Sequence, residues 1–129
     1  MKEMEYDELE EFKKDLKKLS KRYKSLKDDI EIIRKVLKVN PEARPPFSFN
    51  IDGLGIKNCI IKIKKIACKS LKGKGINTGL RLVYAHFKKR VEDVDGIETE
   101  LDEKIIFVEL YHKNDKANEN KERILKYFE

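Results

Sequence analysis

The sequence predicts a small α+β domain, in which helices pack on an antiparallel sheet. Three observations predict this class. Apolar residues recur at helical spacing in the N-terminal third, the period then changes to the alternation typical of strands, and a helical pattern returns at the C-terminal end. The 129 residues suffice for one domain of common size, so we expect residues 1–129 to form a single domain.

Two helices are predicted first, joined by a tight connection as an antiparallel pair. Their apolar stripes are Leu9, Phe12, Leu16, Leu19 and Tyr23 in the first helix, and Leu26, Ile30, Ile33 and Leu37 in the second. Residues 25–28 resemble a capping box that starts the second helix, and Asn40-Pro41 ends it. Before the helices, Met4 and Tyr6 alternate with polar residues, as in a short edge strand.

The middle of the chain predicts strands separated by loops. Prolines and glycines predict a loop over 41–55, three glycines predict another over 70–79, and polar residues 88–103 contain the turn signal Asp95-Gly96. We expect strands at 59–67, 80–87 and 104–111, and a closing helix at 118–128. The element order is therefore (β)ααβββα, with no internal repeat.

Charge is high and unevenly spread. Charged residues make up 42% of the chain and hydrophobic residues 40%, so a core is affordable in a strongly solvated protein. Residues 53–90 hold 11 of the 30 basic residues and no acidic residue, which leaves 19 basic against 24 acidic elsewhere. Such a segment favours a polyanion over a merely solvated face: nucleic acid, an anionic membrane or an acidic partner peptide.

The sequence lacks the features of several other classes of protein. No apolar run is long enough to span a membrane, and the acidic start lacks the apolar region of a signal peptide. The two cysteines, Cys59 and Cys68, are too few for a disulfide scaffold and are expected to be reduced thiols in the cytoplasm. With His86 and His112 they lack metal-ligand spacing, so we expect no metal and no cofactor. Nothing marks a Ser/His/Asp triad.

Arg81 is the most informative single residue. It stands in an otherwise apolar predicted strand, just after the glycines of the segment 70–79. An arginine there is either paired with a carboxylate or directed at an anion. The sequence Gly73-Lys74-Gly75 is neither a dinucleotide-binding nor a Walker motif, because it joins two strands, and a lysine-bearing turn is the simpler interpretation.

The chain resembles the RelE/ParE toxin superfamily in three stretches. Gly73-Lys74-Gly75 with the following 79–84 segment GLRLVY resembles the family's "GK…GG.RVIY" stretch. The 106–116 segment IFVELYHKNDK resembles its final strand, "I.LL.IY.K.DK", and the 12–19 segment FKKDLKKL resembles its first helix, "F.KDLKKL". The resemblance covers most of the chain and implies a small antiparallel sheet with a helical pair on one side.

The resemblance implies the toxin of a type II toxin–antitoxin system. RelE-like members act as metal-independent mRNA endonucleases at the ribosome, where the ribose 2′-OH attacks the adjacent phosphate. The partners implied are a cognate antitoxin, the ribosome and mRNA, with no membrane and no small-molecule cofactor. Two alternatives stay open: a ParE-like inhibitor of DNA gyrase, and a non-catalytic RelE-fold binding protein.

The resemblance also suggests residue roles. Arg81 matches the strand arginine that stabilises the phosphorane. Lys62 and Lys64 would share one sheet face and hold the RNA backbone or act as the base. Tyr111 and His112 lie where family members keep an acid or a base. Strand alternation places Glu109, Tyr111 and Lys113 on one face and His112 on the other, unless a bulge intervenes. The expected RNA-binding residues are Lys65, Lys69, Lys72, Lys74 and Lys113. The family has no single catalytic set, and the 88–103 connection is longer than in many members.

Overall fold

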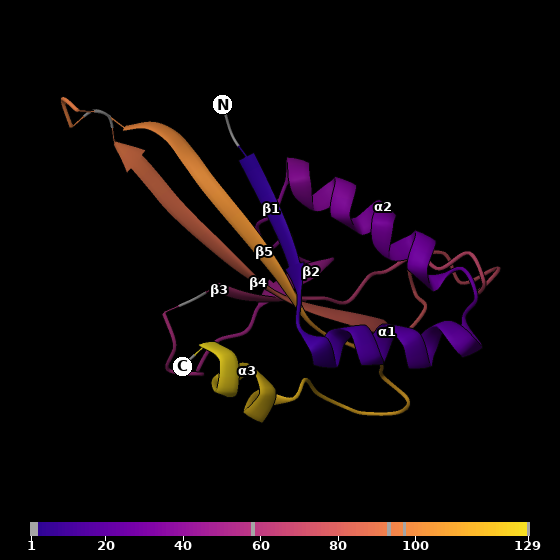
Figure 1. The fold of residues 1–129 in the computed structure, drawn as a ribbon. Helices are drawn as coiled ribbons and strands as arrows, with labels where there is room; N and C mark the ends of the chain where they lie inside the picture. The colour runs from indigo at the N-terminus through magenta and orange to yellow at the C-terminus, as the bar shows by residue number, and fades with distance from the viewer. Residues whose placement is uncertain (1–2, 58, 93, 97, 129) are drawn as a thin grey trace.

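The α+β class is confirmed: helices pack on both faces of one sheet (Figure 1). The computed structural model describes residues 3–57, 59–92, 94–96 and 98–128, with the backbone alone at 3, 89–92 and 98–102. Within those residues the elements are β1 (Glu3–Glu8), α1 (Glu10–Arg22), α2 (Leu26–Val39), β2 (Ser48–Asn50), β3 (Cys59–Ile63), β4 (Leu80–Glu92), β5 (Glu98–His112) and α3 (Lys121–Phe128).

The sheet is mixed, whereas a purely antiparallel sheet was expected. Its five described strands have the order β1-β5-β4-β3-β2, and β2 to β5 form antiparallel pairs. The edge strand β1 pairs in parallel with β5, from Glu3 opposite Asp102 to Glu8 opposite Phe107. The alternation of Met4 and Tyr6 correctly predicted an edge strand, but alternation carries no information about the direction of the partner.

The helical pair forms where the apolar stripes predicted it. α1 buries Phe12 and Leu19, and α2 buries Leu26, Ile30 and Leu37 against the sheet. Both helices therefore bury these apolar residues in the same core, and this places the pair on one face of the sheet.

The expected capping box at the start of α2 is wrong, although the helix begins there. The Ser25 backbone is already helical, with φ −82° and ψ −5°, and its side chain makes no cap hydrogen bond. The Ser25 hydroxyl instead donates to the Asp29 carboxylate at 2.8 Å and accepts the Ser70 backbone N–H at 2.8 Å. At the other end α2 stops before Asn40, as expected.

β4 and β5 are longer than predicted, and their hairpin projects beyond the rest of the fold (Figure 1). The segment 88–103, expected to be a polar connection, continues both strands, with Lys88 opposite Glu103 and Glu92 opposite Glu98. Asp95 and Gly96 lie in the turn, as expected. Paired strands satisfy each other's backbone groups, so a polar segment stays extended without an apolar alternation to reveal it.

The other strand boundaries also shift. β2 lies inside the segment 41–55 that was expected to be loop, because a three-residue strand beside prolines is too short to show a period. β3 ends at Ile63, short of the predicted residue 67, and Ile66 makes only an isolated bridge with Asn77. α3 begins at Lys121, later than the predicted residue 118.

Two apolar clusters lie on opposite faces of the sheet. The first packs α1 and α2 on one face, which we call the α1/α2 face, and includes Leu82, Tyr84 and Phe107. The second packs α3 on the other face, the α3 face, and includes Val83 and Val108. Polar side chains that share a face with one of these clusters are thus held by a rigid sheet.

Candidate functional site

The alternation of β4 sends Arg81 to the α3 face. Its neighbours Leu80 and Leu82 belong to the α1/α2 cluster and Val83 to the α3 cluster. Since successive side chains point to opposite faces, Arg81 shares the α3 face with Val83. Its cross-strand partner on β5 is Tyr111.

Arg81 is held by backbone carbonyl groups. Its Nη1 donates to the carbonyl of Lys64 at 2.9 Å and to that of Leu80 at 3.2 Å. Among the described residues no ion pair involves Arg81, so the carboxylate pairing that the sequence left open is not what the structure shows. The other guanidinium nitrogens make no hydrogen bond to a described residue and remain available to an anion.

The Tyr111 hydroxyl is buried without a partner. The residue is 6% exposed, and its oxygen has no hydrogen bond to any described group. Burial raises the pKa of Tyr111 to about 12 by disfavouring the phenolate; the Glu119 carboxylate adds to this rise, and Arg81 opposes it. The Lys116 ammonium lies 4.9 Å from the centre of its ring. At neutral pH Tyr111 is therefore a proton donor with an unused hydrogen bond.

Lys62 is already engaged by a carboxylate. Its Nζ lies 2.8 Å from Glu119 Oε2, and the two side chains are 14% and 9% exposed. Burial disfavours the charged form of Glu119, but the hydrogen bond from Lys62 and further favourable contacts outweigh it, so the pKa of Glu119 is lowered. Lys64 lies just beyond β3 with its ammonium 5.1 Å from the centre of the Phe49 ring. We call Lys62, Lys64, Arg81, Tyr111 and Glu119 the α3-face cluster.

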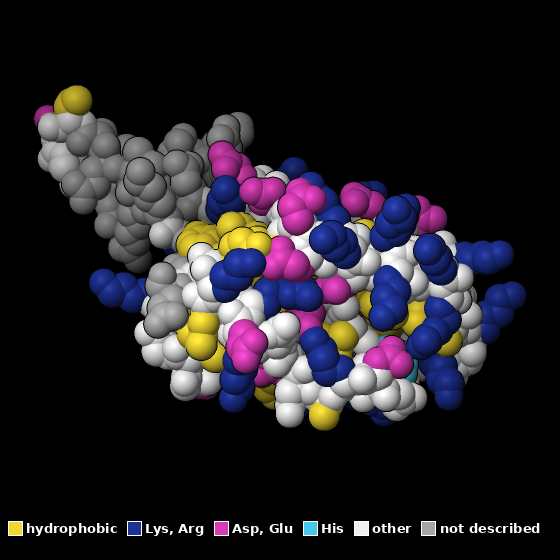
Figure 2. Space-filling model, turned by 60° about the horizontal axis from the view of Figure 1, so that its bottom comes forward, with side chains coloured by type: hydrophobic (Ala, Val, Ile, Leu, Met, Phe, Trp, Pro, Cys, Tyr) yellow, Lys and Arg dark blue, Asp and Glu magenta, His cyan; other side chains and the backbone are white. Residues whose placement is uncertain are grey.

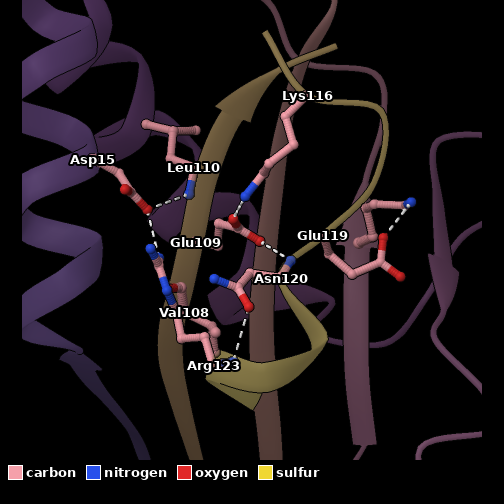
Figure 3. A network of polar contacts seen from close by, with 9 residues as sticks. Asp15, Val108, Glu109, Leu110, Lys116, Glu119, Asn120 and Arg123 are labelled. Atoms are coloured by element: carbon pink, nitrogen blue, oxygen red, sulfur yellow. Dashed lines mark hydrogen bonds and ion pairs between the residues drawn. The ribbon is translucent and has the colours of Figure 1, made fainter. Parts of the chain in front are cut away.

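A buried ionic network holds the chain over this face (Figure 3). Glu109 of β5 accepts a hydrogen bond from the Asn120 backbone N–H at 2.8 Å and pairs with Lys116. On the α1 side, Asp15 accepts from Arg123 Nη1 at 2.7 Å and from a β5 backbone N–H at 3.2 Å. These bonds fix α3 and the segment before it, and hence Glu119, against the sheet.

Sequence reasoning gave no partner to the carboxylates of this region, although strand alternation placed Glu109 on the face of Tyr111. Glu109 interrupts an otherwise apolar strand, and that was a usable signal of a buried charge with a partner. Glu119 gave no such signal, because it lies in a polar segment and meets Lys62 only through the folding of α3.

His112 is not part of the α3-face cluster. Its Nε2 hydrogen-bonds the Thr78 carbonyl at 2.9 Å, and its Nδ1 accepts the Asn114 backbone N–H at 3.1 Å. The ring stacks on Tyr23, the residue that follows α1, with 6.1 Å between the ring centres. Both nitrogens are thus used on backbone groups of the α1/α2 face, which gives His112 a structural role.

The basic residues of the segment 53–90 divide into two sets. Lys62 and Lys88 of the strands are paired with Glu119 and Glu42. Exposed basic residues lie on the loop between β3 and β4, at Lys65, Lys69, Lys72 and Lys74, with Lys113 after β5.

This loop lies beside a second basic segment. The hydrogen bonds between Ser25 and Ser70 join it to the turn between α1 and α2, and α1 ends in Lys21 and Arg22. Figure 2 shows Lys and Arg side chains gathered at the right-hand end of the molecule, where these segments lie in Figure 1. Among the described residues, Lys65 is the one lysine of this loop with a side-chain hydrogen bond: its ammonium donates to Asn77 Oδ1 at 2.8 Å. Lys69, Lys72 and Lys74 are exposed to solvent.

A pocket of about 430 Å³ lies at the base of the hairpin and was also missed. His86 and Cys59, which are cross-strand partners, contribute to its lining. His86 Nε2 is 2.6 Å from Glu103 Oε2, with both side chains almost wholly buried. The Cys59 thiol donates to Asn50 Oδ1 at 3.1 Å, and partial burial raises its pKa.

Neither a metal-binding cluster nor a membrane-spanning helix is found among the described residues. The described residues contain no group of three or more His, Cys, Asp or Glu that could hold a metal ion. Both Cys59 and Cys68 are free. In the part of the chain that the structure describes, no helix combines the length and apolar character needed to cross a bilayer.

Comparison of the chain with protein-family models, curated proteins and solved structures finds no match in any of the three.

Proposed function

We propose that this protein is the toxin of a type II toxin–antitoxin system and a metal-independent, ribosome-dependent mRNA endonuclease. One observation carries the proposal: Arg81, with unused guanidinium donors, stands directly opposite a buried Tyr111 hydroxyl that has no described partner. A phosphate group is an acceptor that both could share. The helical pair on one sheet face is also what the resemblance to the RelE/ParE superfamily implies.

The chemistry would proceed by attack of the ribose 2′-oxygen on the adjacent phosphorus. A bond forms between the 2′-oxygen and phosphorus while the proton of the 2′-hydroxyl passes to solvent water, the bond to the 5′-oxygen breaks, and a 2′,3′-cyclic phosphate results. Arg81 stabilises the charge that builds on the phosphorane, and Tyr111, kept protonated by burial, donates to the departing 5′-oxygen. Lys64 contacts the backbone near Arg81, and His112 takes no part.

Lys62 joins the site only when Glu119 releases it. In the free protein the Glu119 carboxylate holds the Lys62 ammonium at 2.8 Å, so an RNA phosphate must compete with an internal anion. Removing one partner of such an enclosed pair leaves the other charge without compensation. Binding of RNA and movement of the segment before α3 are therefore coupled.

The basic loop and the end of α1 supply the docking surface for ribosomal RNA. Lys69, Lys72 and Lys74 of this loop are exposed and would contribute affinity through the phosphate backbone. Such binding weakens steeply with salt, because counterions are released from the phosphates. A toxin of this type acts in the cytoplasm and is held inactive there by an antitoxin carrying Asp and Glu.

A second candidate function has its own support. Because Lys62 is neutralised by Glu119 and Tyr111 is enclosed, the fold could act by binding alone. That would make it a ParE-like inhibitor of DNA gyrase, or a RelE-fold protein that binds only protein or RNA.

One set of assays separates these functions. The purified protein is added to programmed ribosomes and, separately, to gyrase with relaxed plasmid, while induced expression reports on growth and translation. We expect cut mRNA with 2′,3′-cyclic phosphate ends and normal supercoiling. Inhibited supercoiling without cleavage would assign the gyrase function, and activity in neither assay with unimpaired growth would leave the binding protein.

A further inference from the structure

A second apolar stripe runs along the outer side of α2. Ile32, Val36 and Val39 follow one another at i, i+4 and i+7, so they lie on one side of the helix. They are 47%, 48% and 83% exposed, although α2 buries a separate stripe in the core. The helix thus has two apolar sides, and the fold of this chain covers only one of them.

The stripe continues past the end of α2 into a pocket. Phe47 is 42% exposed and, with Val36, lines a pocket of about 180 Å³ beside Leu37, Ile63 and Tyr84. We call Ile32, Val36, Val39 and Phe47 the α2 patch. Contiguous apolar surface next to a pocket is typical of a site for a partner, whereas isolated exposed apolar residues are not.

The rim of the α2 patch is positive. Lys35, Lys38 and Arg44 are exposed, and in the described chain none of them forms an ion pair. Arg44 lies over the Phe47 ring, 5.9 Å from its centre. Two nearby carboxylates are paired, Glu31 with Arg34 at 3.0 Å and Glu42 with Lys88, while Asp28, one turn before Ile32, is exposed.

This charge distribution selects the occupant. A second copy of the chain would bring the same cations against each other, and the whole chain carries a net charge of +6. A helix with apolar residues at i, i+4 and i+7 and carboxylates on its flanks would cover the stripe and neutralise the rim. We propose that the α2 patch is the docking surface for an acidic amphipathic helix of another protein, with one apolar side chain in the pocket beside Phe47. This inference does not depend on the proposed RNA chemistry.

The test uses two synthetic helical peptides as probes. Both carry leucines at i, i+4 and i+7; one has glutamates on the flanks and the other has lysines. Binding to the full chain is measured by fluorescence anisotropy at physiological salt. We expect the glutamate peptide to bind at least tenfold more tightly, and Arg44→Gln to narrow that difference.

Neutral substitutions locate the binding surface without altering charge. Val36→Ser and Val39→Ser, both at exposed positions of α2, should each weaken binding of the glutamate peptide several-fold, and together about tenfold or more. Val94→Ser is the matched control, because Val94 is fully exposed in the hairpin turn far from α2. Circular dichroism checks that helix content is kept.

Three results would overturn the proposal. Equal affinity for the two peptides would contradict the proposal that the partner is acidic. Binding that is unchanged by both α2 substitutions would show that the peptide binds elsewhere, for example on the basic loop. A concentration-dependent dimer that Val36→Ser dissociates, measured by sedimentation, would assign the patch to a second copy of this chain.

Discussion

The tyrosine and histidine side chains buried on the two faces of the sheet differ in how far their hydrogen bonds are satisfied. On the α1/α2 face, the Tyr84 hydroxyl donates to the Pro41 carbonyl at 2.7 Å, and His112 uses both ring nitrogens on backbone partners. On the α3 face, the Tyr111 hydroxyl finds no described partner and Arg81 keeps donors unused. A satisfied group supports folding, whereas a buried group without a partner costs stability. The α1/α2 side also holds one such group among the described residues, the Ser20 hydroxyl.

Ionic groups show the same contrast. Where Glu109 and Asp15 pin α3, each carboxylate has two donors, although both residues also line a pocket of about 380 Å³. Beside them, Glu119 and Lys62 form a single contact with each other. The comparison distinguishes carboxylates held by two donors from a carboxylate held by one side chain.

The largest expected effect comes from Arg81. Arg81→Ala should slow mRNA cleavage about 10²–10³-fold, since a donor to the charged transition state is lost. Stability should change by less than about 1 kcal/mol, because only hydrogen bonds to two carbonyls disappear. Arg81→Lys should restore part of the rate, as a point charge cannot reproduce the planar fork.

Cleavage and melting temperature are measured on the same proteins, with Arg44→Ala as the control at an exposed arginine. Full cleavage activity in Arg81→Ala would show that Arg81 does not take part in the reaction. A parallel fall in melting temperature and cleavage rate would indicate a structural role for Arg81.

The next largest effect is expected at Gly79, beside His112 on the α1/α2 face. Gly79 has φ +84°, and a Cβ there would lie 2.7 Å from His112 Nε2. Gly79→Ala should therefore cost roughly 3 kcal/mol of unfolding free energy, from the left-handed backbone and from displaced His112 hydrogen bonds. Gly73→Ala has a similar φ of +80° with open space around it, and should cost only about 1 kcal/mol. Urea unfolding that gives equal costs would show that His112 is not fixed where it lies.

A matched pair of tyrosines compares the faces directly. Tyr84→Phe should destabilise the protein by about 1–2 kcal/mol, because the Pro41 carbonyl loses its donor. Tyr111→Phe should leave stability unchanged or raise it, since the hydroxyl removed has no partner. In the cleavage assay the order should reverse, with only Tyr111→Phe slower. Equal destabilisation by thermal melting would contradict the contrast between the faces.

The smallest effect is a pH dependence at Glu119. Its pKa in the folded protein lies below its usual 4.5, so the pair with Lys62 stabilises the fold above the unfolded-state pKa. That contribution is lost as pH falls through the folded-state pKa. Glu119→Gln should therefore flatten the acid limb of the stability curve and increase RNA affinity a few-fold by freeing Lys62. Glu122→Gln, at an exposed residue of α3, is the control and should match the native protein in both measurements.

Local patterns predicted much of the fold. The stripes of α1 and α2 and the alternation after them are local signals, and all three gave the correct element type. The hairpin ends of β4 and β5 were not predictable this way, because two polar strands hold each other through backbone groups. The direction of β1 depends on a partner about 100 residues away, which no local window contains.

The candidate site was predictable only in part. Strand alternation correctly separated Tyr111 from His112, because the face of a side chain is a property of one strand. The roles of these residues stay predictions. Lys62 was expected to be free, yet its partner Glu119 comes from a segment placed by Glu109 and Asp15. Such a contact follows from tertiary packing and leaves no mark in the sequence near either residue.

The parallel pairing of β1 with β5 sets the order in which the protein can fold. During synthesis, α1 and α2 leave the ribosome early, but the β1 edge has no partner until β5 has been made. Closing contacts of such long range is entropically costly and slow. The sheet is therefore completed in a late step, and a chain interrupted before β5 presents an open β1 edge to other unfolded chains.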